Sequence, residues 1–484
     1  MFSSYLLLAF AGAVSASCNS STSLVSATTT EGCACQELST TYPEYLYYPN
    51  STNYTTVNLE AWDTRSNLEP SCIFNPVTAD QVADGMSVIS KCNAQFAIRG
   101  GGHMNFPGAN NINGGVMLAL SGLDRIQISA DNSTVEVGPG LRWFDIYSYL
   151  EPYGRIVIGG RLKTIGVPGL TLIGGVHYFA NKYGYAMDNV VSYDVVLGNG
   201  TQVTATANSS SDLFWALKGG ANNFGVVTKF TLKTFAIPQV STTIQVFNES
   251  VDDASVAAGA VITINYNATT KVVSASLIGV QEGTESPPSR FANFSSIPAV
   301  RAVNNVSSMA TFAAQLDSPL QMFRVKFGHH TMRPDADQLY SFYQIWKAAV
   351  DEIADVDGLY PTFVLNLDPA SANTIAKTNG VGNVWGADDS ESAIWYQTST
   401  GWNLAKDDLR VQTWSRQLTA KLHALNQAEG LSSEFIYMGD AGEDQDPWVG
   451  MPVENVERMK TVRAKYDGGG VFTYLNWGGF KLPN

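Results

Sequence analysis

The sequence is poor in cysteine, in positive charge and in long apolar runs. Lysine and arginine number 29 against 43 aspartates and glutamates, and no basic cluster occurs. Because binding to phosphate backbones needs clustered positive charge, we expect no nucleic-acid partner. Beyond the N-terminus, no apolar run is long enough to span a bilayer, so we expect no membrane partner either.

Two common kinds of reactive site are also missing. No Gly-x-Ser-x-Gly element of a hydrolase nucleophile is present, and no Cys/His set has the spacing of a zinc site. His329 and His330 are adjacent, which is not the same-face spacing of a helical metal site. We therefore expect no metal site.

The N-terminus is typical of an exported protein. Residues 1–16 carry no charged side chain, contain an apolar run and end in small residues suited to cleavage. We interpret them as a signal peptide, the alternative being an anchored N-terminal helix. Glycosylation sequons support a secreted, extracellular glycoprotein. They lie at Asn19, Asn50, Asn53, Asn132, Asn199, Asn208, Asn248, Asn267, Asn293 and Asn305.

The five cysteines all lie in the first hundred residues, at Cys18, Cys33, Cys35, Cys72 and Cys92. Disulfides among them would tie the N-terminal segment to the chain that follows. An odd number leaves one thiol free or joined to another molecule. Two bridges among five cysteines allow fifteen pairings, so the connectivity stays open.

A chain of 484 residues is too long for one ordinary core, and we expect two domains. After the signal peptide we place a largely irregular arm at residues 17–65, with a short helix near residues 35–38. A cofactor domain at 66–237 and a second domain at 238–430 follow. A closing segment at 431–484 returns to the cofactor domain. The boundary between the cofactor domain and the second domain is placed near Pro238, because glycine-rich stretches become rare there.

Periodicity and capping residues predict the main elements. The expected helices are 79–91, capped by Thr78, and 142–150, 211–217, 335–350, 409–428 and 453–466. The expected strands are 95–98, 116–120, 126–128, 135–137, 226–235, 241–247, 271–278, 362–367 and 434–440.

The most informative motif is Arg99-Gly100-Gly101-Gly102-His103, directly after the apolar run 96–98. A strand that ends in three glycines leaves bare backbone N–H groups and no Cβ, so a pyrophosphate can approach closely. Further glycine-rich stretches follow at 138–140, 166–175 and 219–225, and a Tyr-Gly-Tyr-Ala-Met-Asp-Asn-Val segment lies at 183–190.

In order and spacing, these motifs resemble the FAD-binding domain of the berberine-bridge-enzyme-like oxidases, within the vanillyl-alcohol oxidase superfamily. The resemblance runs from about residue 70 to 235 and resumes at the C-terminus. It implies an α+β fold, with a two-part FAD-binding domain of the PCMH type. The second domain would bind substrate with an antiparallel β-sheet backed by helices.

The resemblance also implies that His103 is bonded covalently to the FAD, the alternative being a loop histidine with an ordinary hydrogen bond. Many relatives carry a second link through a cysteine, and Leu162 stands at that position here. Because no cysteine follows Cys92, a second thioether is excluded. Single attachment favours a narrower site and a compact metabolite over an oligosaccharide.

The remaining residues expected to contact FAD are the glycines and their neighbours in these motifs, although each could instead serve an ordinary turn. They are Arg99, Gly100, Gly101, Gly102, Met104, Gly140, Gly166, Gly169, Gly174, Gly175, Asp188, Asn189, Val190, Gly225 and Val227.

A flavin oxidase must also take a proton from the substrate as hydride leaves carbon. The family often carries a Tyr-x-Asn element for this, which here reads Tyr437-Met438-Gly439. We expect Tyr437 to be the base or an orienting hydroxyl, with Asp440 as a substitute; a packed core tyrosine is the alternative. His177 is expected either to face the flavin or to fill the interior. Trp385, Trp395, Trp402 and Trp477 are candidates for an aromatic wall.

We therefore expect a secreted FAD-linked oxidoreductase that oxidises a small organic substrate, such as an alcohol, an amine or a secondary-metabolite intermediate. Hydride would pass to the flavin, and dioxygen would reoxidise it to give hydrogen peroxide. The alternatives are a carbohydrate oxidase, a flavin dehydrogenase that excludes dioxygen, and a secreted binding glycoprotein without turnover. The oligomeric state stays open.

Overall fold

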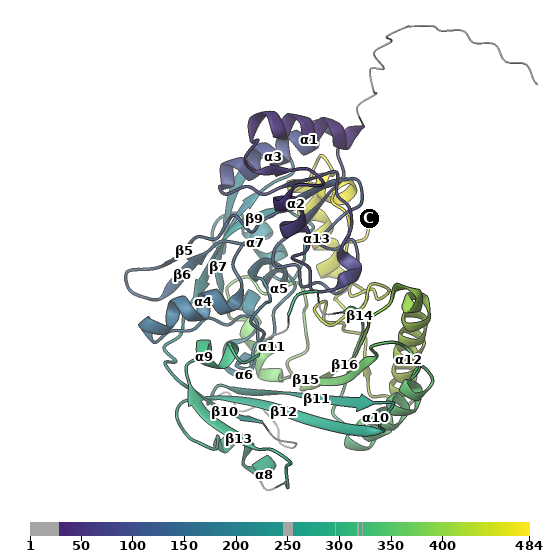
Figure 1. The fold of residues 1–484 in the computed structure, drawn as a ribbon. Coiled ribbons are helices and arrows are strands. Elements are labelled where there is room, and N and C mark those ends of the chain that lie inside the picture. The colour runs from purple at the N-terminus through teal and green to yellow at the C-terminus, as the bar shows by residue number, and fades with distance from the viewer. Residues whose placement is uncertain (1–28, 245–254, 296, 317–318, 322) are drawn as a thin grey trace, which may run out of the picture.

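The computed structural model describes residues 29–244, 255–295, 297–316, 319–321 and 323–484. In these residues the strands form three sheets. Two smaller sheets lie in the upper part of the molecule, and a large one lies below them (Figure 1). The α+β class predicted from the sequence is confirmed. The expected signal peptide, Cys18 and two of the sequons, Asn19 and Asn248, lie outside the described residues.

The first sheet has the order β1 (Leu46–Tyr47), β2 (Cys72–Phe74), β4 (Val116–Ala119), β3 (Phe96–Arg99). Its last three strands are parallel and mostly buried, as a sheet covered on both faces should be. Helix α3 (Ala79–Cys92) connects β2 to β3. Thr78 accepts a hydrogen bond from the Gln81 N–H, which confirms the predicted cap.

The second sheet is antiparallel, in the order β5 (Ile126–Ile128), β6 (Thr134–Val137), β9 (Val226–Lys233), β7 (Val190–Val196), β8 (Gln202–Thr206). Helices α4 (Trp143–Leu150) and α7 (Ser211–Ala216) share its core, where Trp143, Tyr193 and Phe230 are buried. The glycine turn after β3 therefore lies where the two smaller sheets meet.

The large sheet is antiparallel throughout its described pairings. Its order is β13 (Val303–Ser307), β10 (Val240–Ile244), β12 (Val272–Glu282), β11 (Ala258–Asn267), β15 (Tyr360–Asp368), β16 (Ala393–Trp402), β14 (Arg324–Met332), β17 (Ser432–Ser433). Helices α10 (Ala336–Asp351) and α12 (Asp408–Ala428) cover one face (Figure 1). The predicted antiparallel sheet backed by helices is confirmed.

Shorter elements complete the chain. They are α1 (Thr30–Thr41), α2 (Thr52–Asn58), η1 (Thr64–Ser66), η2 (Glu151–Tyr153), α5 (Val167–Leu172), α6 (Ala180–Tyr183), η3 (Ala186–Asn189), η4 (Ser289–Phe291), α8 (Ala292–Ser295), α9 (Met309–Ala313), α11 (Ala370–Ala376), η5 (Ala405–Asp407), α13 (Val453–Tyr466) and η6 (Val471–Leu475). Among the described helices, none has the length and apolarity needed to cross a membrane.

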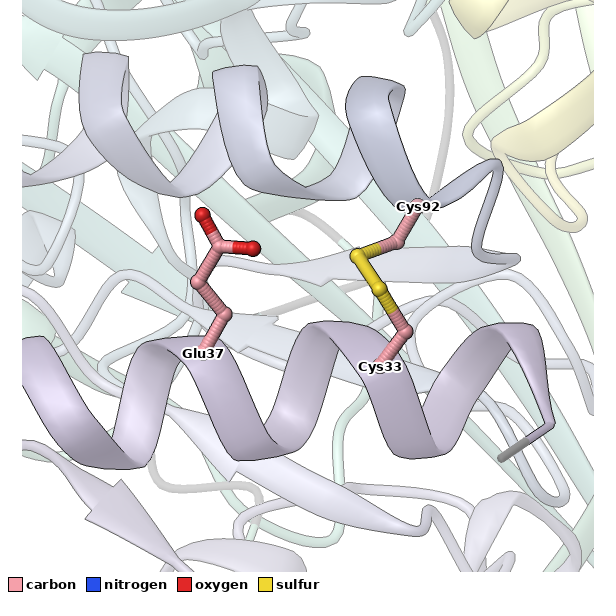
Figure 2. A group of neighbouring side chains, drawn as sticks. All are labelled: Cys33, Glu37 and Cys92. Atoms are coloured by element: carbon pink, nitrogen blue, oxygen red, sulfur yellow. A yellow bond between two sulfur atoms is a disulfide. The ribbon is translucent and has the colours of Figure 1, made fainter. Parts of the chain in front are cut away.

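The arm is more regular than predicted, because its described part forms α1, β1 and α2. Two disulfides fasten α1, joining Cys33 to Cys92 and Cys35 to Cys72. Figure 2 shows the first bridge beside Glu37. The Glu37 carboxylate pairs with Lys91 at 2.9 Å, and the two sulfur atoms are bonded to each other. This group therefore offers no thiolate to a metal ion.

The strand predicted at 434–440 is wrong. β17 ends at Ser433, and the chain then runs irregularly to a turn in which the Asp440 N–H donates to the Tyr437 carbonyl. In a half-buried strand, successive side chains point alternately into the core and into solvent. Here the four successive side chains of residues 435–438 are all buried. Burial from every side favours an irregular path through the core over an edge strand.

The closing segment, yellow in Figure 1, packs on the first sheet. Phe472 contacts Phe96 edge to face, with ring centroids 5.9 Å apart, and the Trp477 N–H donates to the Phe96 carbonyl at 2.6 Å. The Leu482 N–H donates to Asn223 at 3.0 Å. The last residues thus brace the strand that leads into the glycine turn.

We predict that the double variant Cys35→Ser/Cys72→Ser folds with a free energy of unfolding lower by about 2–4 kcal/mol, because the unfolded chain gains the freedom of the opened loop. Chemical denaturation followed by tryptophan fluorescence measures the change. Wild-type protein unfolded in reductant, which opens both bridges, should lose at least as much stability as the variant, and an unchanged midpoint in the variant would contradict the structural role of this bridge.

Candidate functional site

A cavity of about 330 Å³ lies between the smaller sheets and the uncovered face of the large sheet. Its walls come from the turn after β3, the loop before α5, the start of β9, and strands β14, β15 and β16. Successive side chains of β15 point to opposite faces. Val364 and Asn366 line the cavity, whereas Phe363 and Leu365 belong to the core beneath the helices.

The glycine turn allows two backbone segments to touch. A Cβ placed on Gly101 would lie 2.5 Å from the Cα and N atoms of Gly166, a separation that real Cβ atoms do not tolerate. Gly102 has φ +69°, and its Cβ would lie 2.0 Å from the Glu60 carbonyl oxygen. The Arg142 guanidinium joins the same segments by donating to the carbonyls of Gly101 and Thr164. Glycine is therefore required at these positions.

His103 lies in the cavity wall next to this turn. Its ring stacks on Trp62 with centroids 5.0 Å apart and planes 14° apart, and its Nε2 is 3.0 Å from the Thr164 hydroxyl. Burial lowers the pKa of His103 to about 3, helped by the positive charge of Arg142. The imidazole is therefore held in one orientation and is neutral at ordinary pH.

The predicted cofactor and catalytic residues divide into two groups. Those that line the cavity are Gly100, Gly101, Gly102, His103, Met104, Gly166, Gly169, Gly225, Val227, Tyr437 and Asp440, together with Leu162. Those that lie outside its lining are Arg99, Gly140, Gly174, Gly175, His177, Asp188, Asn189 and Val190.

Several of the second group hold the surrounding framework. Arg99 is buried, donates to the Val57 and Asn58 carbonyls at the end of α2, and thereby attaches the arm to β3. Burial lowers its pKa to about 10. Asp188 accepts from the Tyr185 N–H at 3.0 Å, and Asn189 donates to the Tyr185 carbonyl at 2.9 Å. These contacts fix the turn ahead of β7.

His177 is buried and lines a smaller void rather than the main cavity. Its Nδ1 accepts from the Phe179 N–H at 3.1 Å, and its Nε2 has no hydrogen-bond partner among the described residues. Burial lowers its pKa to about 3. Of the two roles that the sequence left open, this position matches a filled interior.

A polar group closes the end of the cavity nearest the large sheet. Asn366 donates from Nδ2 to Asp440 Oδ2 at 2.9 Å, and its Oδ1 accepts from Arg161 Nη1 at 2.9 Å. Asp440 is nearly buried, and this burial raises its pKa to about 6, although Arg161 and Asn366 both act in the opposite direction. The site thus holds a carboxylate that changes charge close to neutral pH.

Sequence reasoning missed Arg161, Asn366 and Gln397, which all line this end. Asn366 interrupts the apolar stretch 363–367 of β15, and that interruption was the available signal, whereas Gln397 begins a polar stretch of β16 and gives none. Arg161 lies in a loop, where charged residues are common, so its sequence position did not indicate a role in the site.

None of the four tryptophans proposed for an aromatic wall is among the residues that line the cavity. Tyr437 stacks on Trp395 with centroids 4.8 Å apart, and Trp385 meets Tyr437 edge to face at 5.7 Å. Trp402 lies elsewhere, with its indole N–H donating to Asp408, and Trp477 is about half exposed. The pKa of Tyr437 is raised above its usual value, mainly because the side chain is buried and also because the charge of Asp440 is nearby. A hydroxyl with a raised pKa is a weak base.

These residues fit a bound flavin nucleotide. Gly100, Gly101 and Gly166 line the cavity with backbone that carries no side chain, and such bare backbone, the glycine cradle, suits a pyrophosphate. Asn110 contributes a buried Oδ1 that has no partner among the described residues and can accept a hydrogen bond. Mostly apolar walls with a few polar groups are typical of cofactor pockets.

Comparison with known proteins agrees with this geometry. Residues 70–206 match the family model described as an FAD binding domain. The chain is 31% identical to FAD-dependent monooxygenase prx3 of Penicillium roqueforti, over 93% of this chain and 94% of that protein. The chain belongs to the berberine-bridge-enzyme-like family of FAD-dependent oxidoreductases.

Solved structures of this family share the fold of the chain. BBE-like 1 of Physcomitrella patens superposes with a TM-score of 0.75 at 17% identity, covering 93% of this chain and 99% of that one. Berberine bridge enzyme from Eschscholzia californica gives 0.74 at 16% identity, covering 91% and 98%. As a berberine-bridge-enzyme-like protein, the chain is an FAD-linked oxidoreductase, and the resemblance seen in the sequence is confirmed.

We predict that Gly101→Ala abolishes flavin retention, because the new Cβ would force the two touching segments apart. The absorbance ratio of flavin to protein after purification measures the loss. Gly469→Ala is the matched control, since that glycine lacks a positive φ and its Cβ would have no neighbour closer than 3.9 Å. A fully yellow Gly101→Ala protein would contradict the close approach.

Proposed function

We propose that the protein is a secreted oxidase that removes two electrons and two protons from a small organic substrate. The substrate would be an alcohol, an amine or an intermediate of secondary metabolism. The observation that carries this proposal is the presence of Asp440 and His103 in the walls of one cavity, beside the glycine cradle. When bound, FAD supplies the acceptor for the two electrons, which dioxygen then takes up with release of hydrogen peroxide.

His103 is proposed as the single covalent attachment point for FAD. Its neutral imidazole keeps a lone pair on nitrogen, which is the form that can bond to an electrophilic carbon. The stack on Trp62 and the contact with Thr164 hold the ring in place. Leu162, which lines the same cavity, offers no second attachment.

Asp440 is proposed as the base that takes the substrate proton. Its pKa of about 6 makes it a carboxylate at neutral pH while keeping it basic enough to accept a proton. Tyr437 is better suited to orienting the substrate, because its raised pKa keeps its proton in place. This assignment reverses the order of the two residues that the sequence favoured.

Secretion is supported by the surface positions of the sequons and by the two disulfides. Among the described sequons, Asn132 is partly exposed and the others are exposed: Asn50, Asn53, Asn199, Asn208, Asn267, Asn293 and Asn305. Such positions can accept a glycan without disturbing the core.

The alternatives differ in measurable ways. A carbohydrate oxidase would release peroxide with oligosaccharides, which suit an open groove better than this compact cavity. A flavin dehydrogenase would reduce an artificial dye but release no peroxide in air. A binding glycoprotein without turnover would purify colourless or would not be reduced by any substrate.

We predict that acid precipitation of the wild-type protein leaves flavin in the pellet, whereas His103→Ala releases its flavin into the supernatant. The visible spectra of both fractions measure this. Wild-type flavin that appears in the supernatant would contradict the covalent link, even if the protein is yellow before treatment.

We predict that Asp440→Asn slows oxidation by about 10²–10⁴-fold, the usual contribution of a general base. In the wild type the rate should rise with pH through about 6, because the carboxylate form accepts the proton, and this limb should vanish in the variant. Stopped-flow flavin reduction, with a substrate found by peroxide release, measures both effects. Asp446→Asn, an exposed carboxyl outside the cavity, is the control.

A further inference from the structure

Arg161 places a positive charge in the cavity wall. Among the described residues that line the cavity, it is the only lysine or arginine, and Asp440 is the only carboxyl. Every other polar lining group on the large-sheet side is an amide or a hydroxyl, such as Asn366, Gln397 and Tyr437. The charge of Arg161 is therefore exceptional in this site.

The Arg161 guanidinium is held in place by uncharged groups and not, within the described residues, by a direct ion pair. Its Nη1 donates to Asn366 Oδ1 at 2.9 Å, and its carbon lies 5.8 Å from the centre of the Tyr178 ring. No carboxylate of the described chain forms a salt bridge with Arg161, and its link to Asp440 passes through the Asn366 amide. The remaining N–H groups are left for a ligand in the cavity.

Arg161 is a partly buried cation that no carboxylate of the described residues contacts directly, since Asp440 is reached only through Asn366, and an anionic ligand could occupy its remaining N–H groups. The planar guanidinium also matches oxygen anions geometrically, since it can donate two parallel hydrogen bonds. Apolar side chains line the same cavity, among them Trp62, Phe327 and Val364. The cavity thus combines an anion-binding point with a surface for a flat hydrocarbon portion.

We infer that Arg161 binds an anionic oxygen of the substrate, supplied by a carboxylate or by an ionised phenol or enol, next to the group that Asp440 deprotonates. This inference rests on the proposed function. A single amide joins Arg161 to Asp440, so the anionic oxygen and the reacting O–H or N–H lie only a few bonds apart in the substrate. The substrate class is therefore a compact acid whose oxidised carbon lies close to its acidic oxygen.

The test uses four probes with the purified holoprotein: benzoate, methyl benzoate, 4-nitrophenolate and 4-nitroanisole. Binding is followed by perturbation of the flavin spectrum, which requires no turnover. In the wild type, at least one anion should bind about tenfold or more tightly than its neutral counterpart, the size of one charge-assisted hydrogen bond. Preference for benzoate assigns the anion to a carboxylate, and preference for 4-nitrophenolate assigns it to a phenol or enol.

Two variants and a control locate the effect. Arg161→Gln should lose the preference while binding the neutral probes as before, and Arg161→Lys should keep part of it. Lys163→Gln, two residues away and with its ammonium over the Phe144 ring, should retain wild-type selectivity. Flavin content and far-ultraviolet circular dichroism show that each variant is folded.

Equal binding of charged and neutral probes by the wild type would overturn the inference. So would an Arg161→Gln variant that keeps the selectivity while its flavin reduction potential falls, since Arg161 would then serve the flavin. A colourless wild-type protein is a different failure, because it removes the proposed oxidase function itself.

Discussion

The close contact between Gly101 and Gly166 is the constraint on which the rest of the site depends. The turn after β3 and the loop before α5 approach each other to a distance that only glycine permits. The Arg142 guanidinium bridges their carbonyls, and the neighbouring residues His103 and Thr164 meet as a consequence. The cradle, the position of His103 and the end of the loop that carries Arg161 all follow from this one approach.

The arm completes that arrangement from the outside. Trp62 stacks on His103, and the adjacent Arg65 pairs with Asp63 and with Glu443 of the closing segment, each at 2.9 Å. Glu443 also pairs with Lys326 of β14 at 3.0 Å. Asp63 is buried, and this burial raises its pKa to about 6. Three distant parts of the chain therefore share one ionic cluster beside the cavity.

The sequence predicted the framework better than the site. Helix α3, with its Thr78 cap, and helix α13 were found because caps and periodicity act locally. The glycine turn was found because several glycine-rich motifs follow one another in a characteristic order and spacing. Residues 434–440 were mistaken for a strand because burial from all sides depends on tertiary packing. Arg161, Asn366 and Asp440 form one network only after a loop, a strand and the closing segment converge, and no local pattern encodes that meeting.

The attachment of FAD is tested most directly by mass spectrometry of proteolytic peptides from the purified protein under denaturing conditions. We predict that the peptide containing His103 carries the mass of one FAD, and that the peptide containing Leu162 is unmodified. An unmodified His103 peptide from a protein that was yellow before digestion would contradict the covalent link. FAD found on any other peptide would contradict the placement of the flavin in this cavity.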